Sequence, residues 1–524
     1  MKNILQATPT WIFSLTVCGI LYGANLVLGN LNQDEGWYLY TAKLMSQGQL
    51  PFRDFAYTQG PIMPQVYAWA YPVVDALGVA GGRAITALFA LIALLLSGLC
   101  AVRLAPAGWK HTTALLCITL LGINVYHSYY TTVVKTYGLC TAIIMLGFYF
   151  FIRCARSGNA TAAFFAGVFI ALASGVRIST GIALFPCGLY LLMRYRSLNH
   201  APWLAFGMGG ILCLTTIFLP FYLMAPEAWT FGMFEYHTAR NAGDSYWVFK
   251  AGFISRMVQA YYLAFALLVV LFFIWFKNRK ISNDLPNQLL PVLWLCLLSV
   301  SLVHFTASIP YEDYQVVLYP LFCVLLSTSL CHYLARHEFA TAWKPWLPIT
   351  VTIIATASAF SSPVNQDWMT IGRDRIWWRM KDKPDLLKLQ DVGMHLRKKS
   401  AGAGELFTQD AYLAVESGLD LPKNMAMGCF SYYPNLPRAR AEKLHVMNRE
   451  MLHEYLNQPT AKIAALSEYS LAIQSPEISE LSQEQQEDLW SRVLDKYQLI
   501  DTIPDFGHGH TRLKILQLKP AQSD

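Results

Sequence analysis

The sequence has little charge for its length. Only 14% of its 524 residues are Asp, Glu, Lys or Arg, whereas about 25% is typical of a soluble domain. Apolar residues make up 55% of the chain, and the mean hydropathy is +0.34. This composition argues against a soluble enzyme, a disordered chain or a coiled coil.

Motifs for nucleotides, metals and disulfides are also missing. The sequence contains no Walker A, GxGxxG, GxSxG or HExxH motif, and no Cys-x-x-Cys pair. An enzyme of the cytoplasmic nucleotide-sugar type is therefore unsupported. Ten of the eleven cysteines lie among apolar residues and are interpreted as small hydrophobes. Cys429 is alone in the C-terminal part, which excludes an internal disulfide there.

The charge that is present is unevenly distributed. Residues 1–362 hold 31 charged residues, about one in twelve, whereas residues 363–524 hold 42, about one in four. This difference predicts a membrane domain over 1–362 and a soluble domain over 363–524. The net charge of +7 does not indicate nucleic-acid binding, because the basic residues gather at the ends of the apolar segments.

Apolar segments that approach the length of a membrane span, about 20 residues, recur along the first domain. We expect eleven spans, the first of them an uncleaved helix. Their approximate ranges are 9–30, 82–104, 112–128, 131–152, 160–175, 180–193, 202–225, 257–276, 287–308, 315–334 and 345–362.

Segment 61–80 decides the orientation, because counting it as a span would invert everything after it. It is interrupted by Pro64, Pro72 and Asp75. Without it, one side of the membrane carries twelve basic residues and two acidic ones. The positive-inside rule then places the N-terminus in the cytoplasm and residues 363–524 outside. Segment 61–80 is accordingly interpreted as juxtamembrane or re-entrant.

Eight basic residues run against this rule, since they fall on or near the outer side. Because acids also gather there, we expect a polar outer site that binds an anion. The eight are Lys43, Arg53, Arg83, Lys135, Arg177, Arg240, Lys250 and Arg256.

The first outer loop, within 31–81, holds the strongest candidates for chemistry. It places Asp34 and Glu35 just beyond the first span, followed by Trp37, Tyr38 and Tyr40. Two adjacent carboxylates at a membrane face need water or cations to offset their desolvation. The alternative interpretation is a helix N-cap followed by an interfacial aromatic belt.

This loop resembles the first outer loop of polytopic GT-C glycosyltransferases that use lipid-linked sugars. The resemblance rests on Asp-Glu after the first span, a Tyr-x-Tyr-x-Ala helix, a Gly turn, Pro-x-x-Asp at 51–54, and Gly60-Pro61. That superfamily includes dolichyl-phosphate-mannose protein mannosyltransferases and aminoarabinose transferases for lipid A. The resemblance implies that Asp34 is the catalytic carboxylate, with Glu35 beside it, and that Asp54 contacts donor or acceptor.

The chain departs from the family in two places that concern metal binding. It reads Gln59-Gly60-Pro61 where the aminoarabinose transferases have Glu-Lys-Pro, and its second outer loop has Asn124 and His127 but no carboxylate. The departures therefore argue against metal binding through those acids. A divalent metal is left open, no cofactor is certain, and no metal ligand is assigned.

Several outer cations could hold the phosphate of a lipid donor. Arg177 interrupts an apolar run; phosphate binding, a structural ion pair and snorkelling are its three interpretations. Lys135 is expected four residues inside the fourth span, where it contacts a phosphate or an acid, or snorkels to the outer interface. The loop 226–256 adds Arg240, Lys250 and Arg256 among aromatic residues.

A short late loop at 309–315 could contact donor or acceptor. It contains Tyr311, Glu312, Asp313 and Tyr314, and a similar Tyr-rich segment is common in the same family. The alternative is an acid placed at a helix N-terminus. His304 is interpreted as a core histidine, and the Gly-His-Gly-His segment at 507–510 is a weak metal signal.

In the soluble domain, segments at 405–409, 470–474, 497–503 and 513–519 are typical of strands. Amphipathic helices are expected at 383–399, 439–457 and 481–496. The fold expected is therefore an α-helical polytopic GT-C-like membrane domain followed by a periplasmic α/β domain.

The function expected is transfer of a sugar from a polyprenyl-phosphate donor to a lipid, glycan or protein acceptor. The reaction would occur on the outer face of a bacterial inner membrane, among membrane lipids. A transporter or flippase of a lipid-linked glycan is the alternative. Such a protein would need internal repeats and charges near the bilayer midplane, whereas the sequence shows no internal repeat and its acids cluster at one face.

Overall fold

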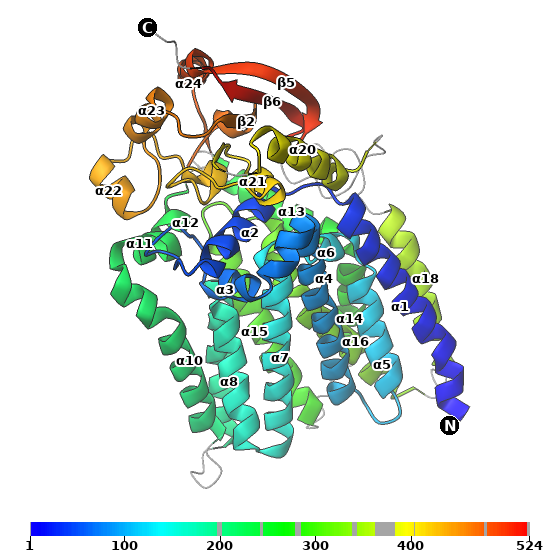
Figure 1. Cartoon of the computed structure of the whole chain (residues 1–524). Coiled ribbons are helices and arrows are strands. Elements are labelled where there is room, and N and C mark those ends of the chain that lie inside the picture. The colour runs from blue at the N-terminus through cyan, green and yellow to red at the C-terminus, as the bar shows by residue number, and fades with distance from the viewer. Residues whose placement is uncertain are drawn as a thin grey trace.

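The structure is a computed structural model that describes residues 2–195, 202–240, 245–277, 285–337, 343–361, 383–402, 404–475 and 479–520. A bundle of helices lies below and a smaller α/β lobe lies above it (Figure 1). The described bundle ends at Ser361 and the described lobe begins at Lys383. The expected boundary between 362 and 363 lies outside the described residues, as do the basic residues Arg196, Arg279 and Lys280.

Each of the eleven expected apolar segments contains a helix. The bounds are α1 Lys2–Leu28, α4 Tyr71–Leu104, α5 Lys110–Gly122, α7 Thr136–Ser157, α8 Ala160–Ser174, α9 Leu184–Arg194, α10 Pro202–Met224, α14 Tyr262–Lys277, α15 Leu285–Thr306, α16 Tyr319–Leu334 and α18 Trp346–Ser361.

Only some of these helices can cross a bilayer alone. Among the described residues five are long and apolar enough, and a sixth candidate is the pair α13–α14, which is bent by 89°. A 13-residue helix such as α5 is about 20 Å long, shorter than the roughly 30 Å hydrocarbon core. The expected number of eleven spans therefore stays a prediction. The five are Pro9–Leu28, Tyr71–Leu104, Thr136–Ser157, Pro202–Met224 and Gln288–Thr306.

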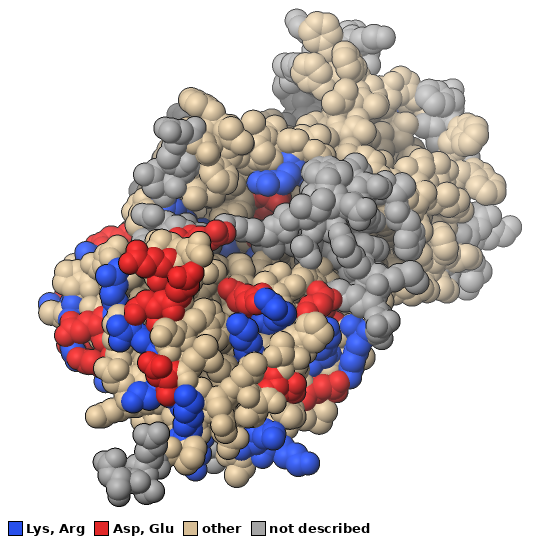
Figure 2. Space-filling view, turned by 90° about the horizontal axis from the view of Figure 1, so that it is seen from above, with Lys and Arg blue, Asp and Glu red and all other residues tan. Residues whose placement is uncertain are grey.

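The outward faces of the bundle are apolar. Large aliphatic and aromatic side chains there are between 59% and 69% exposed, which suits contact with lipid better than contact with water. They include Ile12, Leu95, Ile211, Leu223, Phe273 and Leu302. In the view from above, blue and red side chains crowd the nearer lobe (Figure 2).

Short helices connect the bundle at its lobe-facing end. They are α2 Gln33–Ser46, α3 Ile62–Trp69, α6 Val125–Tyr130, α11 Pro226–Thr230, α12 Tyr236–Thr238, α13 Tyr246–Ala260, the 3-10 helices Ile178–Ala183 and Glu312–Val317, and the π-helical turn Phe231–Glu235. Segment 61–80 forms no separate spanning helix: it supplies the eight-residue α3 and the start of α4, which kinks at Gly78.

The segment 226–256, expected as a loop, is largely helical: short helical turns cover 226–238, and α13 occupies Tyr246–Ala260. The exposed face of this helix is mainly apolar. Lys250 and Phe253 are buried, whereas Trp247 and Val248 are exposed. Aromatic and basic residues at an interface fit a loop and a surface helix equally well, so composition alone did not distinguish them.

The lobe is built on a four-stranded sheet in the order β1-β2-β6-β5, in which only β1 and β2 are parallel. A two-stranded sheet pairs β3 with β4. The strands are β1 Leu406–Phe407, β2 Ile463–Ser467, β3 Ile473–Gln474, β4 Ser479–Glu480, β5 Tyr497–Phe506 and β6 Thr511–Leu518; the helices are α20 Asp385–Lys399, α21 Ala411–Ser417, α22 Arg438–Lys443, α23 Arg449–Asn457 and α24 Gln483–Lys496.

Three expectations for the lobe are corrected. The central strand β2 was not expected, because its alanine-rich sequence is fully buried and shows no alternation. The strand expected at 470–474 is mostly a 3-10 turn. The helix expected at 439–457 is two helices, separated where His445 adopts a positive φ and Asn448 caps α23.

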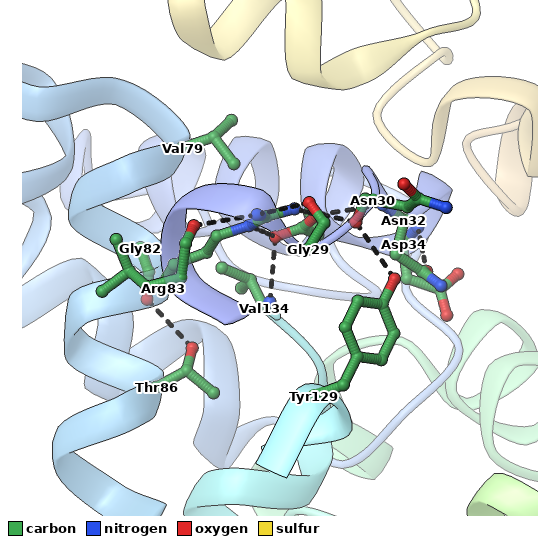
Figure 3. A network of polar contacts seen from close by, with 12 residues as sticks. Gly29, Asn30, Asn32, Asp34, Val79, Gly82, Arg83, Thr86, Tyr129 and Val134 are labelled. Carbon is green, nitrogen blue, oxygen red and sulfur yellow. Dashed lines mark hydrogen bonds and ion pairs between the residues drawn. The ribbon is translucent and has the colours of Figure 1, made fainter. Parts of the chain in front are cut away.

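A buried ion pair fixes α2 to the bundle (Figure 3). Arg83 of α4 donates to both carboxylate oxygens of Glu35, at 2.7 and 2.6 Å, and both side chains are fully buried. Its remaining N–H groups donate to the carbonyls of Leu26, Gly29 and Asn30. All five guanidinium donors are thereby used, which is the condition under which a buried charge is tolerated.

We expect Glu35→Ala to destabilise the protein severely, because it leaves Arg83 buried without a counter-charge. Breaking such a pair costs about 3–5 kcal/mol. Thermal unfolding in detergent measures the effect. The matched control is Arg53→Ala, which breaks the exposed Arg53–Asp54 pair in the same outer loop and should change nothing measurable. A Glu35→Ala protein as stable as the wild type would contradict this role.

Candidate functional site

The first turn of α2 sends its two carboxylates in different directions. Asn32 caps the helix by accepting from the Asp34 N–H, and Glu35 accepts in return from the Asn32 N–H. Neighbouring positions on a helix differ by about 100°. Glu35 therefore points to Arg83, whereas Asp34 faces a cavity and keeps a 24% exposed side chain. Glu35, expected beside Asp34 at the site, belongs instead to the buried framework.

The cavity lies where the bundle, α2 and the lobe meet, and its volume is about 120 Å³. The lobe contributes three of the lining residues, so the bundle alone does not form the cavity. The lining residues are Asn32, Gln33, Asp34, Trp37, Tyr38, Thr58, Gln59, Lys135, Thr136, Tyr137, Arg177, Tyr236, His237, Arg240, Tyr311, Asp313, Tyr314, Phe430, Tyr469 and His508.

Asp34 is held by an ion pair with Lys135, which also pairs with Asp313. The Lys135 ammonium lies 3.1 Å from Asp34 Oδ2 and 3.0 Å from Asp313 Oδ2, and Trp37 Nε1 donates to the other oxygen of Asp34. Burial acts to raise the pKa of Asp34, but Lys135 and these hydrogen bonds hold the pKa below its ordinary value. Asp34 is therefore ionised at neutral pH and able to accept a proton.

Lys135 was expected inside a span, but it precedes α7 as its N-cap residue. The helix begins at Thr136, so the ammonium reaches the cavity from the end of the bundle. Its pairing with Asp34 and Asp313 favours the interpretation as an acid contact over snorkelling.

Arg177 lies between two aromatic rings. Its guanidinium carbon is 4.7 Å from the Tyr137 ring centre and 4.9 Å from that of Tyr314, and one terminal nitrogen donates to Thr136 at 2.8 Å. No carboxylate in the described part of the chain forms an ion pair with it, and its Nε lacks an acceptor there. A buried cation that is stabilised mainly by π faces retains the capacity to bind an anion.

Arg240 approaches the same region from beyond α12. It donates to the phenol oxygens of Tyr236 and Tyr314, at 3.2 and 3.4 Å, and its Nε also lacks an acceptor among the described residues. Both arginines line a second cavity of about 130 Å³, which continues past Ile178 and Val303 toward α15. Arg177 and Arg240 therefore lie at the junction of two cavities.

Several expected site residues lie elsewhere. Lys250 donates to the carbonyls of Phe305 and Ala307 at the end of α15. Arg256 pairs with Glu312 at 3.1 Å, and neither lines the cavity. Asp54 pairs with Arg53 at the surface of the loop that follows α2. Of the late loop, Tyr311, Asp313 and Tyr314 do line the cavity.

Other lining residues were not assigned to the site from the sequence, although His237 belongs to the expected basic loop 226–256 and Phe430 to the aromatic segment 421–434. His237 donates from Nε2 to the Thr58 carbonyl at 2.8 Å. Burial and the nearby Arg240 lower the pKa of His237 to about 4, so this imidazole is neutral at pH 7. Phe430, Tyr469 and His508 come from the lobe. The Gly-His-Gly-His segment, which contains His508, gave only a weak signal for a metal.

The residues present do not fit a divalent cation. The described residues contain no group of three His, Cys, Asp or Glu side chains that could ligate one. Between the two carboxylates that line the cavity, Asp34 and Asp313, stands the ammonium of Lys135. A metal would have to displace this ammonium to reach both oxygens at coordination distance.

The comparisons with known proteins support the fold expected from the resemblance. No family model matches the sequence, and no curated protein matches it. Among solved structures, ArnT from Cupriavidus metallidurans bound to undecaprenyl phosphate aligns with a TM-score of 0.62 at 11% identity, over 99% of both chains. Its apo form aligns with a TM-score of 0.60 at 12% identity, over 97% of this chain and 98% of that one.

A third similar structure is the Archaeoglobus fulgidus oligosaccharyltransferase in complex with zinc and sulfate. It aligns with a TM-score of 0.50 at 11% identity, over 87% of this chain and 68% of that chain. Identities this low establish the fold and nothing finer. The chain has the GT-C fold of a polytopic membrane protein, which confirms the fold class expected from the sequence; the number of spans and the periplasmic placement of the lobe stay predictions.

We expect Lys135→Ala to create a divalent-cation site that the wild type lacks, because Asp34 and Asp313 would then face each other without a cation. Electron paramagnetic resonance of added Mn²⁺ measures binding directly. The variant should bind Mn²⁺ with a dissociation constant below about 1 mM, the range of weak carboxylate sites, and Asp313→Asn in addition should abolish it.

The matched control is Lys43→Ala, since Lys43 pairs with the single carboxylate of Asp420. That variant should bind Mn²⁺ no better than the wild type. The contrary result is a wild-type protein that binds Mn²⁺ saturably and loses this binding in Asp34→Asn. That result would overturn the interpretation that the Lys135 ammonium occupies the place of a metal between Asp34 and Asp313.

Proposed function

We propose that the protein is a glycosyltransferase that moves a sugar from a polyprenyl phosphate to a hydroxyl group of a cell-envelope acceptor. The single observation that carries this proposal is the cavity in which an ionised carboxylate, Asp34, lies near two weakly neutralised arginines, Arg177 and Arg240. Sugar transfer from a phosphate needs both: a base for the acceptor proton and cations for the leaving group. A similar structure was determined with undecaprenyl phosphate bound.

The two cavities suit the two parts of such a donor. The sugar would occupy the cavity beside Asp34, and the phosphate would lie at the junction, against Arg177 and Arg240. The lipid chain would leave along the second cavity, where Ile178 and Val303 are about 40% exposed on the apolar outside of the bundle. The planar guanidinium groups can each give two parallel hydrogen bonds to phosphate oxygens.

The reaction would be a direct displacement at the anomeric carbon. As the acceptor oxygen approaches that carbon, Asp34 takes its proton. As the bond to the phosphate oxygen breaks, the arginines stabilise the charge that develops on the phosphate. Lys135 keeps Asp34 ionised and oriented. The same ammonium also pairs with Asp313, which holds it in place beside Asp34.

We also propose that the reaction occurs on the outer face of a bacterial inner membrane. The lobe lies at one end of the bundle (Figure 1), and three of its residues line the cavity there. The positive-inside rule assigns the opposite end to the cytoplasm. Sugars on polyprenyl phosphates, unlike nucleotide sugars, are available outside.

The test of the proposal is transfer of a radiolabelled sugar from undecaprenyl phosphate by purified protein, with Asp34→Asn as the diagnostic variant. The variant should fold normally and lose 10²–10⁴-fold in rate, the typical contribution of a general base. Because the pKa of Asp34 is lowered, the wild-type rate should not fall through loss of this base until the pH is below about 4.

The matched control is Asp54→Asn, which removes a carboxylate from the same loop without touching the cavity and should leave the rate unchanged. An Asp34→Asn protein with more than about a tenth of the wild-type rate would rule out an essential base.

Arg177 should act on donor use. Arg177→Ala removes a charge-assisted contact that is worth about 1.5–3 kcal/mol, so kcat/KM for the donor should fall roughly 10- to 150-fold. Arg177→Lys should recover only part, because an ammonium cannot reproduce the bidentate contact. Initial rates at varied undecaprenyl-phosphate-sugar concentrations measure this. Loss of folded protein with unchanged donor affinity in the remainder would show a structural role instead.

A further inference from the structure

The cavity has two chemically different walls. The arginines belong to the bundle, whereas Phe430, Tyr469 and His508 belong to the lobe, which lies over the bundle (Figure 1). The bundle wall carries all of the charged side chains of the cavity, three cations and the carboxylates of Asp34 and Asp313, beside its own aromatic rings. The lobe wall carries aromatic rings and one imidazole, which can both donate and accept hydrogen bonds.

An in-line displacement requires the acceptor and the leaving phosphate to lie on opposite sides of the anomeric carbon. With the phosphate against Arg177 and Arg240, the acceptor oxygen must approach from the side away from the arginines and remain within reach of Asp34. The lobe adds wall residues other than the arginines, and His508 lies close enough to Asp34 to be among the groups that lower the pKa of Asp34. We propose, building on the proposed function, that His508 and Tyr469 bind the acceptor and that the acceptor is a saccharide.

His508 is held rigidly enough to serve this purpose. It lies in the turn between β5 and β6, directly after Gly507, whose φ is +71°. A Cβ on Gly507 would lie 2.3 Å from the Tyr412 hydroxyl, and one on Gly509 would lie 3.0 Å from Tyr469 Cβ. The turn is therefore packed between the side chains of Tyr412 and Tyr469, and only glycine fits at 507.

The buried carboxylate of Asp410 connects the two residues that flank this turn, Tyr412 and Tyr469. Asp410 accepts from the Tyr412 hydroxyl at 3.0 Å and from the Ser470 hydroxyl at 2.5 Å, and Ser470 is the neighbour of Tyr469. The Tyr469 and His508 rings lie 5.6 Å apart. Asp410 thus positions both acceptor-side residues without lining the cavity itself.

The chemistry of the wall favours a saccharide over a peptide. Phe430 continues into the α2 aromatics, with its ring centre 6.4 Å from that of Trp37, and Trp37 lies 3.8 Å from Tyr38. Ring faces with a few fixed polar groups suit the apolar faces and hydroxyl edges of a sugar. A peptide bound in extended form would instead require a free strand edge, and the lobe presents a hairpin turn to the cavity.

The experiment compares two fates of the same donor in full-length protein in lipid nanodiscs. The donors are undecaprenyl phosphates carrying labelled glucose, galactose, mannose or aminoarabinose. The acceptors are lipid A, a bacterial O-antigen oligosaccharide and a serine-containing peptide. Transfer to each acceptor and release of free sugar to water are measured for the wild type, His508→Ala and Tyr469→Ala.

We expect His508→Ala to raise the KM for a saccharide acceptor about 10-fold, as loss of one good hydrogen bond does, with donor KM and release to water unchanged. Tyr469→Ala should act in the same way, and Tyr469→Phe should recover most of the loss. His510→Ala is the matched control, because His510 lies on the same turn but pairs with Asp505 outside the cavity. It should leave both reactions unchanged.

The outcomes separate this inference from the proposed function. If the wild type neither transfers nor releases sugar from any donor, the proposed function fails. If the wild type is active and His508→Ala lowers release to water as much as transfer, or changes neither, the acceptor assignment is wrong. Use of the peptide in preference to both saccharide-bearing acceptors would overturn the choice of a saccharide.

Discussion

The buried pair between Glu35 and Arg83 is the interaction on which the site depends. It joins α2 to α4 and, through three backbone carbonyls, to the end of α1. The Val134 N–H also donates to Glu35, at 3.2 Å, and Val134 immediately precedes Lys135. The Glu35 carboxylate therefore fixes the helix that carries Asp34. It also fixes the backbone next to Lys135, which is the ion-pair partner of Asp34. The desolvation of two charges is offset because each has a full set of partners.

The charges of the cavity are neutralised to different degrees, and this difference gives them different chemistry. Lys135 contacts two carboxylates and has little attraction left for a substrate anion. Arg177 and Arg240 are surrounded by phenol rings, which stabilise a cation without cancelling its charge. The site thus keeps a carboxylate ionised in one place and a cationic surface in another, although both line the same cavity.

The sequence predicted the broad arrangement but not the contacts. The apolar segments, Asp34 and the tyrosine-rich late loop could be found because they rely on local patterns and a family resemblance. The role of Glu35 could not, since two adjacent acids look alike until the face of the helix is known. Lys250 was misassigned because a basic residue in an aromatic segment carries no sign of the backbone carbonyls that it binds. His508 is separated from Asp34 by more than 470 positions, and no local pattern brings them together.

Helix α2 connects these parts because it presents three different faces. At about 100° per residue, Asp34, Trp37 and Tyr38 lie within one face, which lines the cavity. Glu35, Leu39 and Ala42 form a second, fully buried face that packs on the bundle.

Gly36, Tyr40 and Lys43 form the third face of α2, and it contacts the lobe. A Cβ on Gly36 would lie 2.1 Å from the Tyr412 nitrogen, Tyr40 accepts from the Leu421 N–H, and Lys43 pairs with Asp420. The lobe therefore contacts α2 through Tyr412, the same residue that supports the turn carrying His508. A shift of the lobe along α2 would move His508 relative to Asp34, so the docking of the lobe and the geometry of the site are one constraint.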